Sequence, residues 1–200
     1  MNASLETIPL VNLSLAFVPV VATILILFKW SLKATNAIYA VSRMLVQLLL
    51  IGYFLTYLFE SDSASIVLII LMVMVFASSW IALGTIVDKR RVLYKHAFVS
   101  LSVGGGLTLL LITQGVLALD PWYSPQSMIP IAGMIFANAM NSVSLAAERL
   151  NAEIERNVSY DVARKIALQS SLIPVINSLF AVGLVSLPGM MTGQILSGVS

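Results

Sequence analysis

The residues most able to do chemistry in this sequence are polar side chains that interrupt long apolar runs. Arg43 and Gln47 lie four positions apart in one run, so a helix would place them on the same face. Arg43 lies about 9 Å inside that run, at the rise of an α-helix. Its guanidinium either extends back to the lipid head groups or faces inward, where it would meet a substrate or another helix.

A second polar stripe lies in "IPIAGMIFANAMNSVSLA", where Met134, Asn138 and Asn141 follow the i, i+4, i+7 spacing of one helix face. Amide side chains in lipid seek hydrogen-bond partners on other helices, so these residues either join helices or line a translocation path. The adjacent Met190 and Met191 could bind a soft metal, but no Cys, His or acid stands near them. Packing is the more usual role of methionine.

Several kinds of chemistry are excluded by the residues that the sequence lacks. It has no cysteine, a single histidine (His96), and no Asp or Glu within its apolar runs. The glycines 104–106 are not followed by the lysine of a phosphate-binding loop, and they favour close helix packing or a bend instead. We therefore expect no enzyme activity, no cofactor and no metal site in this chain, and its net charge of +2 indicates no nucleic-acid partner.

The apolar runs that contain these polar residues are expected to form helices that span a membrane. Hydrophobic residues make up 59% of the chain and charged residues 10%, and the mean hydropathy is +0.97. A helix needs about 20 apolar residues to cross the hydrocarbon. The prediction is an all-α, polytopic membrane helical bundle with about six transmembrane helices, at Ile8–Phe28, Ala37–Phe59, Ile66–Val87, Ala97–Leu119, Ile129–Ala147 and Ile166–Leu187.

The basic residues favour one orientation of this bundle. Under simple alternation, ten of the eleven Lys and Arg residues fall on one side, and only Arg43 lies within a span. The positive-inside rule makes that side cytoplasmic and places the N-terminus outside. Because Glu6 is the only charged side chain of the first residues, we interpret the first apolar run as a retained span rather than a signal peptide.

The one substantial segment between spans is 148–169, "ERLNAEIERNVSYDVARKIALQ", which is charged and compatible with helix. It is either a solvated helical hairpin that connects two spans or a docking element for a cytoplasmic partner. Composition alone does not separate these two interpretations.

Three stretches carry a resemblance to a known family. They are "SRMLVQLLLIGYFL" (42–55), "IPIAGMIFANAM" (129–140) and "LIPVINSLFAVGLVSLPGMMTGQILSGVS" (172–200). They resemble the FetB-type (YbbM-type) membrane permeases of bacteria, which are similar to plant aluminium-tolerance half-transporters. The residues that match the family pattern are Arg43, Gln47, Gly52, Tyr53, Pro130, Gly133, Met134, Asn138, Gly183, Leu187, Pro188, Gly189, Met191 and Gly193.

The resemblance implies that residues 1–200 form a single permease domain of an ABC transporter in the bacterial plasma (inner) membrane. A separate cytoplasmic ATPase would drive a permease homodimer that exports iron or another metal or stress-related solute. The plant relatives suggest that a nucleotide-sugar or another solute is an alternative cargo.

The resemblance also distributes roles along the chain. The segment at about 148–169 would couple to the ATPase through Asn157, Ser159, Tyr160, Asp161, Arg164 and Lys165. The translocation path would be lined by Arg43, Gln47, Met134, Asn138, Asn141 and Asn177. A gate or helix break near the outer side would use Pro174, Gly183, Pro188, Gly189, Met191 and Gly193.

The sequence departs from the family pattern at three places. Asn177 stands where the family has Asp, and Phe180 where it has Lys, which weakens the case for a hard-cation site there. The coupling segment reads Asn157-Val158-Ser159-Tyr160 in place of the family's Leu-Gly-Ala-Thr-type turn, so docking of the ATPase is expected to differ. The family continues past the last motif with one more span, so we expect that the chain, which stops at Ser200, is truncated at its C-terminus.

Two other functional classes stay open from sequence. One is an ATP-independent channel or secondary carrier. Helices broken at Pro174 and Pro188 would suit this class, although no intramembrane acid is available for ion coupling. The other is a membrane interaction protein that transports nothing. In each transport hypothesis, Arg43 and the amides suit an anionic or polar solute better than a bare hard cation.

Overall fold

The computed structural model describes residues 9, 12, 14–31, 34–59 and 63–183. These residues fall into two compact units, one that extends to Tyr57 and one that covers 58–184. The first unit contains a short 3₁₀ helix, η1 (Leu15–Phe17), followed by α2 (Val18–Lys29) and α3 (Ala34–Phe59). The large apolar side chains described on α2 and α3 are mostly exposed, as expected of helices that face lipid.

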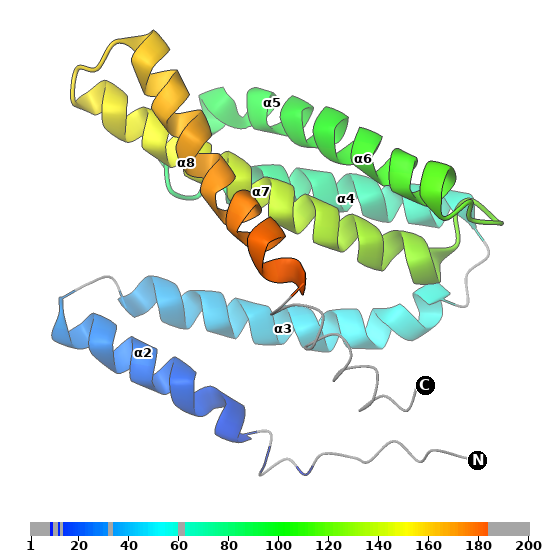
Figure 1. The fold of residues 1–200 in the computed structure, drawn as a ribbon. Coiled ribbons are helices and arrows are strands. Elements are labelled where there is room, and N and C mark those ends of the chain that lie inside the picture. The colour runs from blue at the N-terminus through cyan, green and yellow to red at the C-terminus, as the bar shows by residue number, and fades with distance from the viewer. Residues whose placement is uncertain (1–8, 10–11, 13, 32–33, 60–62, 184–200) are drawn as a thin grey trace. The chain divides into compact units, whose positions relative to one another are not determined.

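The second unit is a bundle that contains the remaining helices (Figure 1). It begins with α4 (Ala64–Ala82). A long helical segment follows, made of α5 (Arg90–Ser100), the π-helical η2 (Leu101–Gly105), α6 (Gly106–Leu110) and the π-helical η3 (Leu111–Val116). Then come α7 (Pro125–Glu155) and α8 (Tyr160–Ala181).

α7 is the central helix of the second unit, because it packs against α4, against η2 and α6, and against α8. The core of this unit gathers where α4, η2 and α7 meet, around Val67, Leu101, Met128, Ala132 and Phe136. Small and large residues alternate here: Ala132 is fully buried, so helices approach closely beside it, while the Phe136 ring fills the space toward η2.

The predicted all-α, polytopic membrane fold is confirmed. Among the described residues, four helices are long and apolar enough to span a membrane, at Ala34–Phe54, Ala64–Ala82, Arg90–Val116 and Pro125–Glu155. The first predicted span corresponds to a shorter apolar helix, Leu15–Lys29, and the sixth to α8.

The predicted boundaries were wrong at the charged ends of the spans. The third span was expected to reach Val87, but α4 ends at Ala82, and the fourth already begins at Arg90. The fifth continues past Ala147 to Glu155. The segment 148–169 consists of the end of α7, a short turn and the beginning of α8, which is the helical hairpin of the first interpretation; its role as a docking element stays a prediction.

Candidate functional site: a groove between α5, α7 and α8

Hydrogen bonds join the basic turn after α4 to the end of α7. The Lys89 Nζ donates to Asn151 Oδ1 at 2.7 Å, and Asn151 Nδ2 donates to Glu155 Oε1 at 2.7 Å. Two basic segments that are far apart in sequence, 89–95 and 149–165, therefore lie at the same end of the second unit. This arrangement agrees with the expectation that both face one side of the membrane.

The turn between α7 and α8 is a Schellman motif. Asn157 takes the left-handed conformation, with φ at 61°. The Val158 N–H donates to the Glu153 carbonyl at 3.1 Å, and the Asn157 N–H donates to the Ile154 carbonyl at 3.0 Å. Asparagine tolerates this conformation better than most residues, which explains why the helix ends here.

A buried carboxylate, that of Glu153, stabilises the end of α7 through ion pairs. The Glu153 side chain is only 6% exposed and pairs with Arg149 at 2.7 Å and with Arg156 at 3.7 Å. The Arg149 Nε is itself buried with no hydrogen-bond partner in the described part of the chain. The turn that carries the predicted coupling residues is thus held by a compact ion-pair cluster.

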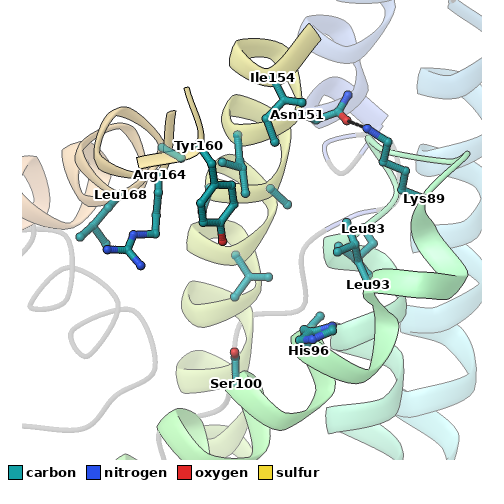
Figure 2. A pocket seen from close by; sticks show the side chains of 16 residues that line it. Leu83, Lys89, Leu93, His96, Ser100, Asn151, Ile154, Tyr160, Arg164 and Leu168 are labelled. Carbon is teal, nitrogen blue, oxygen red and sulfur yellow. Dashed lines mark hydrogen bonds between the residues drawn. The ribbon is translucent and has the colours of Figure 1, made fainter. Parts of the chain in front are cut away.

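A cavity of about 600 Å³ opens beside this turn, between α5, α7 and α8 (Figure 2). We call it the mouth cavity. Tyr160 and Arg164 line it from α8, His96 and Ser100 from α5, and Lys89 from the turn before α5. Tyr160 and Arg164 were predicted as coupling residues, and the structure places both at this cavity.

A second cavity, of about 470 Å³, continues along the same groove and is here called the deep cavity. Its polar lining residues are Ser100, Thr108, Asn138 and Ser142, and Val175 of α8 also lines it. Ser100 and Val143 line both cavities, so the two lie next to each other along α7, from the basic end toward the middle of this helix.

The wall of the deep cavity formed by η2 depends on glycine. Gly105 is buried, and a Cβ at this position would lie 2.6 Å from Phe136 Cε1. At Gly104, which lines the cavity, a Cβ would meet nothing within 4 Å. The close packing expected from glycines 104–106 is therefore specific to Gly105. π-helical turns of the kind found in η2 and η3 occur frequently at functional sites.

The structure brings only part of the predicted translocation path to the groove. All four residues on α7 and α8 are exposed; Asn138 lines the deep cavity, whereas Met134, Asn141 and Asn177 line neither cavity. Arg43 and Gln47 are exposed on α3, in the first unit. The path roles of these five residues stay predictions.

The predicted gate is only partly described. α8 is one helix from Tyr160 to Ala181, so Pro174 lies inside it and does not end it. Gly183 lies just beyond this helix, and a Cβ there would meet nothing within 4 Å. The other gate residues, Pro188, Gly189, Met191 and Gly193, lie outside the described residues.

The remaining coupling candidates lie around the start of α8. Ser159 precedes the helix, and its carbonyl accepts the Ala163 N–H at 2.9 Å. Asp161 occupies the first turn, where a carboxylate interacts favourably with the helix dipole. Asp161 and Lys165 are both exposed. Their surfaces are available to a partner.

Sequence reasoning missed three hydroxyl groups of the deep cavity. Ser142 stands four residues after Asn138, so the same helical spacing that singled out Asn138 could have found it. Ser100 and Thr108 carry no such signal, because only the packing of α5 and α6 on α7 brings them to the groove. Among the described residues, no group of three or more His, Cys, Asp or Glu side chains could hold a metal ion.

The apolar helices and their groove define a polytopic membrane protein. The chain belongs to the uncharacterised protein family UPF0014, whose profile matches residues 10–160 and 158–200. The family resemblance seen in the sequence is thereby confirmed.

Three relatives illustrate the range of this family. The UPF0014 membrane protein slr1647 of Synechocystis is 36% identical over 179 residues, which cover 80% of this chain and 68% of the relative. The probable iron export permease protein FetB of Escherichia coli is 36% identical over 94% of this chain and 77% of its own length. Protein ALUMINUM SENSITIVE 3 of Arabidopsis thaliana is 31% identical over 82% of this chain and 64% of the relative. No solved structure matches the chain significantly.

Proposed function

We propose that this protein is the membrane permease subunit of an ABC-type exporter for iron or another metal. The observation that carries the proposal is the pair of adjacent cavities from the basic end of the bundle to Asn138, in a chain that is 36% identical to the probable iron export permease protein FetB. A separate ATPase supplies the energy, because the sequence contains no phosphate-binding loop of its own. The permease acts as a homodimer in the bacterial inner membrane.

In this proposal the α7–α8 turn is the contact point for the ATPase. The turn combines a rigid Schellman motif at Asn157 with exposed charged side chains at Asp161 and Lys165. A rigid turn transmits a push better than a flexible loop, because no conformational freedom must be lost first. Nucleotide binding by the ATPase would move this turn, and with it the walls of the groove.

The groove indicates how cargo would be held in transit. The polar groups of the deep cavity are three hydroxyls and the Asn138 amide, all of them neutral. Neutral oxygens bind a metal less tightly than carboxylates, which suits a path that must also release its cargo. This cavity would carry a metal with part of its own ligand shell.

The test is coexpression of this chain with a candidate ABC ATPase from the same genome. We expect the two chains to copurify, and we expect ATP to drive iron transport into inverted membrane vesicles. An ATPase with a substituted catalytic glutamate is the control and should copurify without transport. Failure to associate, together with no gain of ATPase activity in lipid, would contradict the proposal. Iron flux that persists in vesicles without any ATPase would favour the channel or carrier class.

A further inference from the structure

The mouth cavity combines apolar walls with positive charge. Ten of its sixteen lining residues are Leu, Ile, Val or Ala. Its charged lining residues are Lys89 and Arg164, His96 adds a titratable ring, and none of the described residues that line it is acidic.

The apolar walls of this cavity favour an apolar ligand over water. Buried water requires several polar partners, and hydrocarbon-lined cavities remain dry or take up apolar ligands. In a membrane protein, the apolar ligand at highest concentration is the acyl chain of a phospholipid. Leu93 of α5, Ile154 of α7 and Leu168 of α8 offer such a chain contact from three helices.

The cavity also lies at the level where lipid head groups are expected. Beside it, Arg90 stacks over Trp80 at 3.9 Å from the ring centroid, and Trp80 contacts Tyr94 edge to face at 5.9 Å. Tryptophan and tyrosine concentrate at the membrane interface, so this cluster marks the head-group region of the basic end. Basic pockets between transmembrane helices at this level bind negatively charged head groups.

We propose that the mouth cavity is a binding site for an anionic phospholipid. The acyl chain packs on the apolar walls between α5 and α8. The phosphate of the head group lies at the rim of the cavity, in the positive potential of Lys89 on one side and Arg164 on the other (Figure 2). Lys89 keeps one hydrogen bond to Asn151, whose amide in turn donates to the exposed Glu155. The remaining N–H groups of Lys89 can donate to a phosphate. The lipid shares the mouth cavity with the proposed transport path, but its binding is tested without an ATPase and without iron, so either proposal can fail while the other holds.

The charge requirement is tested by native mass spectrometry of the full chain released from nanodiscs of equimolar phosphatidylglycerol and phosphatidylcholine. We expect phosphatidylglycerol to remain bound in preference to phosphatidylcholine. The double substitution K89Q/R164Q should weaken retention of phosphatidylglycerol roughly fivefold for each charge removed. The matched control is R91Q/K165Q, which removes two neighbouring charges that do not line the cavity and should leave retention unchanged.

The location of the lipid is tested separately with a unique thiol, because the chain contains no cysteine. In L168C, phosphatidylglycerol in mixed micelles should slow alkylation of the thiol, while phosphatidylcholine and inorganic phosphate should not. L172C, one turn further along α8 and outside the cavity lining, should show no such protection. Equal retention of both lipids, loss of retention in the control pair, or equal protection of both thiols would overturn the proposal.

Discussion

The ring of Phe136 on α7 occupies the space that a side chain at Gly105 on η2 would need. A Cβ at Gly105 would lie 2.6 Å from Phe136 Cε1 and 2.8 Å from Cδ1. Phe136 is 3% exposed and belongs to the core cluster, so its ring has little room to move away. The two residues fix the separation of η2 and α7, and with it one wall of the deep cavity.

The first prediction follows from this contact. G105A should destabilise the protein by about 1–3 kcal/mol, because the added methyl overpacks a closed core. G104A and G106A are matched controls, since a Cβ at either position meets nothing within 4 Å. Each control should be neutral or slightly stabilising, as alanine favours helix over glycine by about 0.5–1 kcal/mol. Thermal unfolding of the detergent-solubilised chain measures the stability of all three variants. Equal effects would show that the Phe136 ring moves aside to make room for the added methyl group.

The ion-pair cluster at the end of α7 gives a second prediction. E153A should lower stability by about 1–3 kcal/mol, because it leaves the Arg149 guanidinium partly desolvated without its carboxylate. The effect is at the low end for a buried pair, since Arg149 is 40% exposed. E155A removes an exposed carboxylate from the same turn and should change stability by less than about 0.5 kcal/mol. If thermal unfolding finds the two variants equal, the cluster does not stabilise the turn.

Asn157 gives a third prediction, which separates the role of its backbone conformation from that of its side-chain amide. N157V should destabilise the α7–α8 turn by about 1–2 kcal/mol, because a β-branched residue is strained at φ 61°. N157G should fold as well as the native chain, because glycine adopts this conformation freely. Copurification of N157G with the ATPase then reports on the amide alone. Full association would show that Asn157 matters only for the backbone conformation of the turn. Loss of association with unchanged stability would show that its side-chain amide contacts the ATPase.

The groove gives a fourth prediction, which compares two amides on α7. N138L should reduce ATP-driven iron transport by tenfold or more, because Asn138 lines the deep cavity and leucine there removes a polar group from the path. N141L should retain most of the transport, since Asn141 is exposed like Asn138 but lines neither cavity. Initial rates in inverted vesicles, corrected for the amount of protein, measure both. Similar losses in the two variants would place the path elsewhere.

Hydropathy predicts the helices of this protein well, because a span needs a long apolar run and lipid forbids unpaired backbone groups. It predicts their ends poorly. Residues 148–155 are charged and lower the hydropathy, yet they are good helix formers, so α7 continues to Glu155 beyond the apolar run. Charge marks where a helix meets water, but the capping motif marks where it ends, and here Asn157, in the left-handed conformation directly after the C-cap Arg156, ends α7.

A residue of the candidate site was predictable only where the sequence of its own helix singled it out. Asn138 was recognisable because an amide in an apolar run is costly without a partner. Thr108 was not, since hydroxyls in helices commonly bond to their own backbone, as Thr108 Oγ1 does to the Gly104 carbonyl at 2.8 Å. The cavity itself arises from the packing of α5, α7 and α8, which no single stretch of sequence encodes.

The unbroken length of α7 has a mechanical consequence. From Pro125 to Glu155 it is one helix, and the Asn151 side chain near one end shares a helix with Asn138, thirteen residues away. That separation is about 20 Å along the axis. Pro130 interrupts the backbone hydrogen bonds of α7 only on the far side of Asn138, so the stretch from Asn138 to the α7–α8 turn contains no proline and would carry a tilt of that turn with little bending. α7 can thus transmit a movement from one end of the bundle to the cavity at Asn138. The hydrogen bond from Lys89 to Asn151 connects the turn before α5 to this helix.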